Sequence, residues 1–314
     1  MPQDPPTVRK SRQHHVWQQY LRSWSEDGRV YCLQGNRVFR TGTPVLGVTT
    51  DFYKVQSLTE QDLKLIHFLA ALDKVHPVAR QHHELVLQNI LSPMLFLRQH
   101  RDDLKNLPQI DDLVDTYNTN AVDNQHTVIE SNFVPLLARS LDEDISWYEN
   151  DQDCMGFCNF IAAQHMRTRG VKELTVSRLK ERMGLDISRI WGILSLIFGF
   201  NIGCSLFLER KRRSLVVVRN DSSVPFVTGD QPVVNLHGNG ETSPESLSFY
   251  YPVSPRLALY LREPAEVAEV PARGMTAEVA NNLNLKMARK SHSQVYAHTA
   301  AALAVVQSQL GKVG

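Results

Sequence analysis

The order of the periodic segments constrains the fold of this 314-residue chain more than any other feature. Short runs with β character occupy residues 29–48, a helical block follows over about residues 57–200, and β character returns from residue 205 onward. This order predicts one α+β domain over residues 13–314, after a disordered basic arm at residues 1–12. The helical block is then inserted between N-terminal and C-terminal β segments that can share one antiparallel sheet, and further helices follow at the C-terminus.

Several local patterns predict where individual elements begin and end. The pair Gly35-Asn36 is typical of a tight turn between two short strands. Ser57, with Glu60 three residues later, predicts the capping box that opens the helical block. Pro93 predicts a kink or a break in the second helix, because proline lacks the amide hydrogen that a helix interior uses.

Charge and cysteine content exclude several classes of protein. The formal net charge is +1, so the chain as a whole has no strong attraction to nucleic acid or to an acidic membrane. Four cysteines form no dense disulfide pattern, and the N-terminus lacks an apolar signal region. Together these features predict a cytoplasmic protein in a reducing environment.

One apolar run, residues 190–208, has about the length of a membrane-spanning helix. Glycine, serine and asparagine residues interrupt it, and a basic run at residues 210–213 follows. A buried helix that breaks into a strand explains this composition better than a membrane span. The basic run is predicted at the tip of a hairpin over residues 205–219, either as a solvated turn or as a finger that contacts phosphate.

A short apolar strand stops at a polar turn around Asp230, within the stretch PFVTGDQPVV at residues 225–234. Pro232 makes this turn rigid, so the carboxylate of Asp230 is held at a strand end, where ligand contacts are often made. The alternative is that Asp230 only accepts hydrogen bonds from its own turn.

Five polar residues lie beside apolar faces and form a candidate site: His14, Glu130, Gln164, Arg167 and Asp230. Gln164 and Arg167 are three residues apart, so they share one helix face. A buried arginine needs an anionic partner, which either Glu130 or Asp230 can supply. The cluster is therefore either a structural network or a site in which Arg167 holds an anion and His14 moves protons.

No metal-binding pattern stands out. Cys154 and Cys158 are one helical turn apart but lack a second cysteine pair, so two buried free thiols explain them better than structural zinc. The common fingerprints of nucleotide-binding loops and of serine hydrolases are absent from the chain.

Four short patterns carry a resemblance to a known family. They are QHHVWQQYLRSW at residues 13–24, QHMRTR at residues 164–169, FVTGDQP at residues 226–232 and PVSP at residues 252–255. In this order they resemble Q-H-x-x-P-x-x-Y-L-R-x-F, Q-x-x-R-T-P, F-x-T-S-D-x-P and P-x-S-P of a bacterial family of unknown function, number 4238. Trp17, Arg169 and Gly229 depart from the family's proline, proline and serine. The resemblance implies a bacterial source and supplies no function.

Two functional hypotheses follow from these residues. In the first, the protein is an enzyme acting on a phosphate-bearing substrate, a nucleic acid or nucleotide, in bacterial phage defence or toxin-type conflict. Its catalytic residues are His14, Glu130 and Asp230, with a divalent metal as one way for the two acids to act, and Gln164 and Arg167 bind the substrate. In the second, the same pocket belongs to a non-catalytic module that senses a ligand or binds a protein. The sequence predicts no membrane partner, names no cofactor and leaves open both the oligomeric state and whether the protein is an enzyme.

Overall fold

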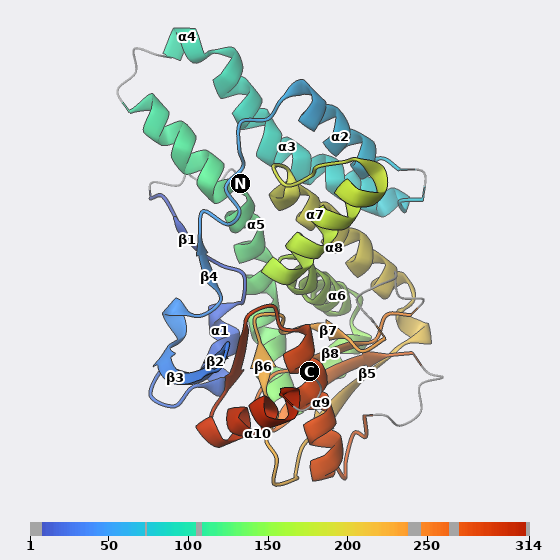
Figure 1. Ribbon diagram of the computed structural model, residues 1–314. Coiled ribbons are helices and arrows are strands. Elements are labelled where there is room, and N and C mark those ends of the chain that lie inside the picture. The colour runs from blue at the N-terminus through green and yellow to red at the C-terminus, as the bar shows by residue number, and fades with distance from the viewer. Residues whose placement is uncertain (1–7, 73, 105–108, 238–245, 264–269, 312–314) are drawn as a thin grey trace.

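A computed structural model describes residues 8–72, 74–104, 109–237, 246–263 and 270–311 (Figure 1). The helices are α1 (Gln18–Leu21), α2 (Glu60–Ala70), α3 (Pro77–Gln99), α4 (Arg101–Leu104), α5 (Ile110–Leu141), α6 (Asp151–Met166), α7 (Arg169–Met183), α8 (Trp191–Leu208), α9 (Ala277–Lys290) and α10 (Ala300–Leu310). The strands are β1 (Arg12–His14), β2 (Arg29–Gln34), β3 (Arg37–Gly42), β4 (Val48–Thr50), β5 (Ser214–Arg219), β6 (Thr228–Gly229), β7 (Val234–Asn235), β8 (Phe249–Pro252), β9 (Leu257–Arg262) and β10 (Gln294–Ala297).

Strands from both ends of the chain share one antiparallel sheet, in the order β3-β2-β10-β6. Tyr296 on β10 lies opposite Cys32 on one side and Thr228 on the other. The hairpin between β2 and β3 turns at Gly35 and Asn36, as their dipeptide predicts. The α+β fold with an inserted helical block is therefore confirmed, and Figure 1 shows α2, α3 and α8 above the sheets.

A second antiparallel sheet, with the order β5-β9-β8-β7, forms from C-terminal strands alone. All four residues of β8 are buried, so this strand is covered on both faces rather than alternating between core and solvent. The strands β1 and β4 make a separate two-stranded pair in which His14 lies opposite Val48. The described β segments thus form three sheets, where the sequence predicted pairing in one.

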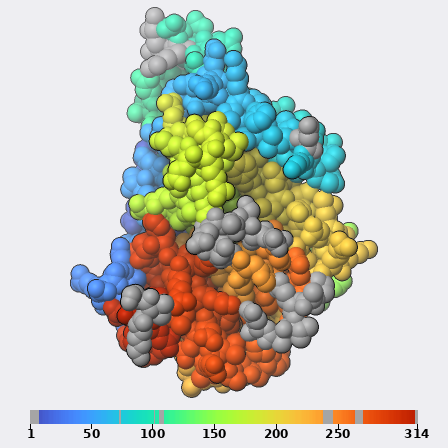
Figure 2. All heavy atoms as spheres, turned by 45° about the vertical axis from the view of Figure 1, so that its right-hand side comes forward, coloured from blue at the N-terminus to red at the C-terminus, as the bar shows by residue number. Residues whose placement is uncertain are grey.

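The helical block is built on the contact between α6 and α8. A Cβ atom on Gly203 would lie 2.9 Å from the Cα atom of Asn159, and one on Gly199 would lie 3.3 Å from the Cα atom of Ala163. These glycines let the two backbones approach closely. By contrast, α7 has no buried residue and lies on the molecular surface (Figure 2).

Among the described helices, α8 is the one that is long and apolar enough to cross a membrane. Within the fold, 61% of this helix is buried, mainly against α6 and α3. That burial fits the core-helix interpretation of the apolar run, because length and composition alone are weak support for a membrane span.

The helix α5 runs from one apolar core to the other. Val122 belongs to the core under α2, α3 and α8, whereas Phe133 belongs to the larger core around the sheets. Ile129 packs against both cores. The middle of α5 therefore lies at the junction of the two cores. Polar side chains at this junction stay close to solvent.

The predicted capping box of the helical block was wrong. The cap of α2 is Thr59, whose hydroxyl accepts from the amide of Asp62 at 3.1 Å while the Asp62 carboxylate accepts from the amide of Thr59 at 2.8 Å. This reciprocal pair displaces the predicted Ser57 and Glu60, because aspartate also serves as the third residue of such a box. Of the two alternatives at Pro93, the break is excluded, since α3 continues to Gln99, and a kink stays a prediction.

The predicted hairpin over residues 205–219 is also wrong. The helix α8 extends to Leu208, and a short 3-10 helix η4 (Arg210–Arg212) follows it. The strand β5 then pairs with β9. The basic run at residues 210–213 therefore lies at a helix end, because packing against α6 keeps the apolar run helical.

The first residues of the described chain are held by specific contacts. The guanidinium of Arg9 lies 2.5 Å from the Asp51 carboxylate and 2.6 Å from that of Asp115. The amide of Lys10 donates to Asn120 at 2.9 Å. Part of the predicted disordered arm, residues 1–7, lies outside the described residues, and from Arg9 onward the chain is fixed against α5.

Candidate functional site

Four polar side chains occupy one face of α5 where the two cores meet: Asp123, His126, Thr127 and Glu130. Their spacings of three, four and seven residues place them on one side of a helix. The side chains of Asp123 and Glu130 are each 18% exposed, and His126 is 2% exposed. This face is partly buried yet reachable from solvent at its two carboxylates.

Arg167, the residue that ends α6, is the buried centre of the site. Its Nε donates to the Tyr53 hydroxyl at 3.0 Å, its Nη1 donates to Oε1 of Glu130 at 2.5 Å, and its Nη2 donates to the backbone carbonyl of His14. Burial alone lowers the pKa of Arg167, but Tyr53 and Glu130 outweigh it and raise that pKa above its ordinary value. The arginine is therefore charged and joins three separate segments of the chain.

Burial dominates the electrostatics of both acids. Burial raises the pKa of Glu130, although Arg167 at 2.5 Å opposes the shift. Burial also raises the pKa of Asp123, against the lowering effects of Lys10 and Arg167. Both carboxyl groups consequently hold a proton at higher pH than exposed acids do.

Two histidines beside Arg167 are neutral at physiological pH. Burial and the nearby positive charge of Arg167 lower the pKa of His14, and they place that of His126 well below the usual value. The ring of His126 lies 4.7 Å from that of Tyr53. Among the described residues, neither ring nitrogen of His126 has a hydrogen-bond partner, and Nδ1 of His14 has none either. A neutral imidazole has one nitrogen that can accept a hydrogen bond or a proton, although the lowered pKa makes it a weaker base.

An open pocket of about 320 Å³ lies above this face of α5, and we call it the junction pocket. Lys10, Arg12 and Arg22 line it from the N-terminal segment, and Arg167 lines it from α6. Lys10 lies 3.6 Å from the carboxylate of Asp123. The pocket thus has a basic side from the N-terminal segment and an acidic side from α5.

Asp230 does not line the junction pocket. It is 2% exposed, and its carboxylate accepts from the amides of His292 at 2.7 Å, Ser293 at 2.8 Å and Gln294 at 3.0 Å. The hydroxyl of Ser293 donates to it as well, at 2.8 Å. Of the two acids predicted as partners of Arg167, Glu130 has that position, and Asp230 holds the connection between α9 and β10.

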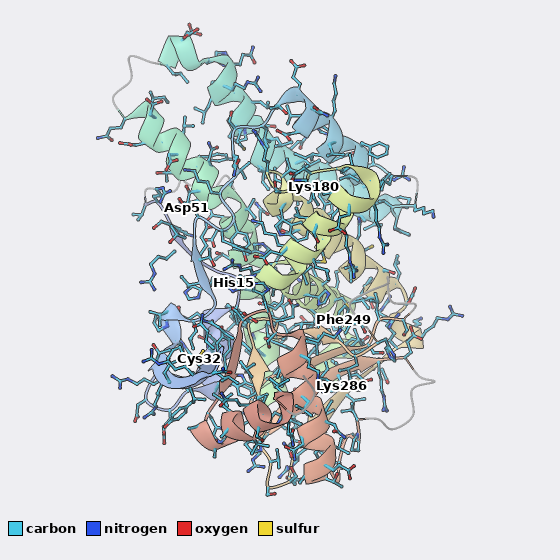
Figure 3. The ribbon with its side chains drawn as sticks, viewed as in Figure 1. His15, Cys32, Asp51, Lys180, Phe249 and Lys286 are labelled. Carbon is cyan, nitrogen blue, oxygen red and sulfur yellow. The ribbon has the colours of Figure 1, made fainter. Side chains whose placement is uncertain are left out.

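Gln164 also lies outside the junction pocket. Its Nε2 donates to the carbonyl of His15 at 3.0 Å, and its Oε1 has no partner among the described residues. Figure 3 shows His15 where the helices meet the sheets. Gln164 and Arg167 therefore fix two consecutive carbonyl groups of the N-terminal segment to α6.

The described residues contain no group of three or more histidine, cysteine, aspartate or glutamate side chains that could hold a metal ion. The cysteines Cys154 and Cys158 are buried free thiols. This geometry does not support a divalent metal held by Glu130 and Asp230 together. Glu130 lines the junction pocket, whereas Asp230 does not.

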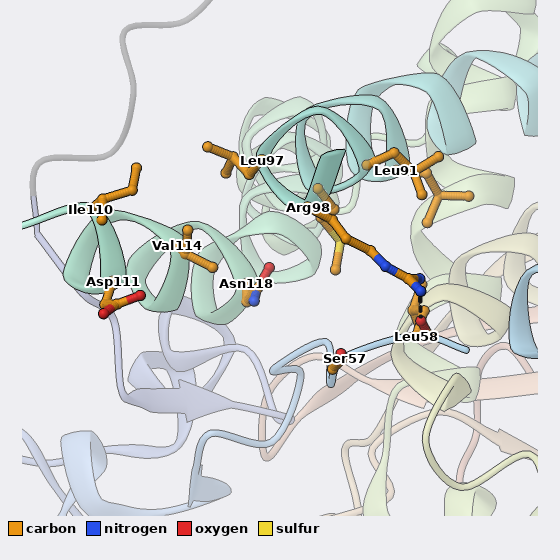
Figure 4. Close-up of a pocket in the computed structure, with 11 residues that line it drawn as sticks. Ser57, Leu58, Leu91, Leu97, Arg98, Ile110, Asp111, Val114 and Asn118 are labelled. Carbon is orange, nitrogen blue, oxygen red and sulfur yellow. Dashed lines mark hydrogen bonds between the residues drawn. The ribbon is translucent and has the colours of Figure 1, made fainter. Parts of the chain in front are cut away.

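A second hollow, of about 240 Å³, lies between α3 and α5 and is mainly apolar (Figure 4). Leu91, Leu97 and Val114 contribute to its walls, and Arg98 donates to the carbonyl of Leu58 at 3.0 Å. None of the predicted site residues lines it. Of these two hollows, the junction pocket is therefore the one that predicted site residues line.

Sequence reasoning missed several residues of the site. Asp123 and His126 precede Glu130 by seven and four residues, so helical spacing from Glu130 could have found them. Tyr53, Lys10 and Arg22 approach from distant segments, and no local pattern marks them.

These features define an α+β protein with a buried arginine–glutamate pair beside an open polar pocket. Residues 201–301 match the model of the family described as "Protein of unknown function (DUF4238)", which confirms the predicted resemblance over this stretch. The matched stretch includes Asp230 but none of the residues that line the junction pocket. No curated protein and no solved structure matches the chain.

Proposed function

We propose that the protein is an enzyme acting on a phosphate-bearing substrate, a nucleotide or nucleic acid, bound in the junction pocket. The observation that carries this proposal is the convergence of Lys10, Arg12 and Arg22 on a pocket that Arg167 also lines. These four cationic side chains outnumber the two acidic ones, so the pocket has an excess of positive charge. Arginine and lysine are the side chains that bind phosphate best.

The pocket also offers a proton acceptor and a proton donor. His14 is neutral, so it can take a proton from a water molecule whose oxygen attacks phosphorus. The protonated His14 can then give this proton to the oxygen that leaves when its bond to phosphorus breaks, while Glu130 fixes the guanidinium of Arg167 beside the pocket. Arg167 acts as a positioning residue, because it holds Glu130 and the backbone beside His14.

A non-catalytic ligand sensor is the second candidate. Arg167 already has three hydrogen-bond partners in the protein, so the network is complete without a substrate. A ligand bound at the basic side could then change the position of the N-terminal segment without any reaction.

The test compares wild type with Arg22→Gln, which removes an exposed charge of the pocket. Arg29→Gln, at an exposed position of β2 outside the pocket, is the matched control. Phosphate release and the breakdown of RNA, DNA and nucleotides are measured. We expect wild type and the control to turn over at least one substrate and Arg22→Gln to lose affinity for it. Binding without turnover would favour the sensor, and absence of binding would overturn both candidates.

For the biological setting we propose phage defence or toxin-type conflict in the bacterial cytoplasm. The plating efficiency of phages on cells that express wild type or Arg22→Gln tests this setting. Equal plating on both strains and on cells without the protein would contradict it.

A further inference from the structure

The junction pocket has two sides of opposite charge. Arg12 and Arg22 approach from the N-terminal segment, while Asp123 and Glu130 project from α5, where Lys10 lies 3.6 Å from Asp123 and Arg167 pairs with Glu130. The two acids are seven residues apart, which corresponds to about 10 Å along a helix. Thr127, an exposed hydroxyl residue, lies between them.

A simple anion does not use the acidic side, because two carboxylates repel it. A simple cation does not use the basic side for the same reason. A ligand that fits both sides has an anionic group at one end and neutral hydrogen-bond donors at the other. A sugar phosphate has this arrangement, since its hydroxyl groups donate to carboxylates while its phosphate accepts from lysine and arginine.

A buried imidazole supports a ligand at the acidic side. His126 lines the pocket and is 2% exposed, yet both of its ring nitrogens lack a partner among the described residues. Buried polar atoms in native proteins nearly always have a partner, so the unpaired nitrogens of His126 are available to a ligand that enters the pocket. His126 lies three residues after Asp123 and four before Glu130, which places it beside the two acids.

Two amide side chains supply a further contact for a base. Gln18 and Gln19 are half-buried, line the pocket, and make no side-chain hydrogen bond among the described residues. Glutamine can pair with the edge of a nucleobase through its donor and acceptor together. The volume of about 320 Å³ lies at the small end of the range for ligand pockets, about 300–1,000 Å³, and suits a single nucleotide.

We infer that the junction pocket takes a ribonucleoside 5′-monophosphate, with its phosphate at Arg12 and Arg22 and a ribose hydroxyl at Asp123. This inference rests on the proposed function and adds to it the discrimination of ribose from deoxyribose. Asp123 is the specificity-determining residue, because its carboxylate accepts from a sugar hydroxyl that deoxyribose lacks.

The experiment is isothermal titration of the full chain with four probes: adenosine 5′-monophosphate, its 2′-deoxy and 3′-deoxy counterparts, and inorganic phosphate. We expect one of the two deoxy probes to bind about tenfold more weakly than the ribonucleotide, as loss of a hydrogen bond to a charged group predicts. Asp123→Asn should reduce this discrimination severalfold, whereas Arg12→Gln should weaken all nucleotides alike. Asp112→Asn, at an exposed position of α5 outside the pocket, is the control.

The outcomes separate this inference from the proposed function. If wild type binds phosphate-bearing probes but binds all three nucleotides equally, the ribose inference is overturned and the proposed function stands. If wild type binds none of the four probes and no nucleic acid, both are overturned. The comparison of probes on wild type needs no variant, so a variant that fails to fold does not affect it.

Discussion

Oε1 of Glu130 lies 2.5 Å from Nη1 of Arg167, and this contact joins the middle of α5 to the end of α6. The side chain of Arg167 is 4% exposed and that of Glu130 is 18% exposed, so little solvent screens the pair. An ion pair in such surroundings is weak support for stability as a whole, but removal of one partner leaves the other charge buried without compensation.

Glu130→Gln should therefore destabilise the fold by about 3 kcal/mol, because the guanidinium of Arg167 stays buried and loses its counter-charge. Urea denaturation followed by circular dichroism measures the change. The double variant Glu130→Gln with Arg167→Met should lose less free energy of unfolding than the two single variants lose together, because it has no unpaired charge.

Glu173→Gln is the matched control for this prediction. Glu173 pairs with Arg169 at 2.8 Å, but both side chains are about half exposed. Its loss should cost less than about 1 kcal/mol. Equal effects of the two glutamine substitutions would contradict a special role for the buried pair.

His15 should make the protein sensitive to acid. Burial and the charge of Arg167 lower the pKa of His15 to about 3, from an ordinary value of 6.5. Between these two pH values the unfolded chain binds a proton that folded His15 does not bind. The contribution of His15 to stability is thus complete above about pH 6.5 and decreases as the pH falls, by about 1.4 kcal/mol per pH unit.

His15→Phe removes this titration and keeps a ring beside Phe52, whose ring centroid lies 5.3 Å from that of His15. The two proteins are denatured with urea at about pH 7, 6 and 5. Between about pH 6 and pH 5, the free energy of unfolding of wild type should fall by about 1 kcal/mol relative to that of the variant. His67→Phe, at an exposed position of α2, should keep the pH dependence of wild type. A difference between wild type and His15→Phe that is the same at all three pH values would refute the assignment.

The sequence contains much of the fold because several elements depend on local chemistry. The turn at Gly35-Asn36 and the periodic helices are marked by residues that are neighbours in the chain. The end of α8 was predicted too early because the contact with α6, which keeps residues 201–208 helical, is a tertiary one. Thr59 and Ser57 are equally good caps by residue type, so packing of the following turn decides between them.

The site was predicted in part for a related reason. A buried arginine must have an acidic partner, and this requirement identified Glu130 as one of two candidates for Arg167. It could not exclude Asp230, whose actual partners are backbone amides at residues 292–294. It also could not find Lys10, which reaches the pocket because Asn120 holds the N-terminal segment on α5.

Gly229 should not tolerate a side chain, although the pattern F-x-T-S-D-x-P that this stretch resembles has serine at this place. A Cβ atom there would lie 2.0 Å from the hydroxyl oxygen of Ser291 and 2.8 Å from the backbone oxygen of Gln294. Gly229→Ala should lower the free energy of unfolding by about 1–3 kcal/mol, as measured by urea denaturation. Ser291→Gly should not restore stability fully, because the backbone oxygen stays in place.

Gly156→Ala is the control for this crowding. A Cβ atom at Gly156 in α6 meets nothing within 4 Å, so alanine should stabilise the helix by about 0.5–1 kcal/mol. Destabilisation of similar size at both glycines would show that crowding is not the cause at Gly229.

Asp230→Asn should loosen the connection between α9 and β10 without a direct effect on the junction pocket. The carboxylate accepts hydrogen bonds from three backbone amides and one hydroxyl. An asparagine side chain has one acceptor oxygen, and its NH₂ group is a donor that would face those amides. Buried amides that lose their acceptor cost about 1–3 kcal/mol. Hydrogen exchange should therefore accelerate at residues 292–294, while Asp221→Asn, an exposed acid paired with Arg219, leaves their exchange unchanged. If exchange at residues 292–294 is unaltered in Asp230→Asn while nucleotide binding is lost, Asp230 acts on the substrate as the sequence predicted, and its structural role is refuted.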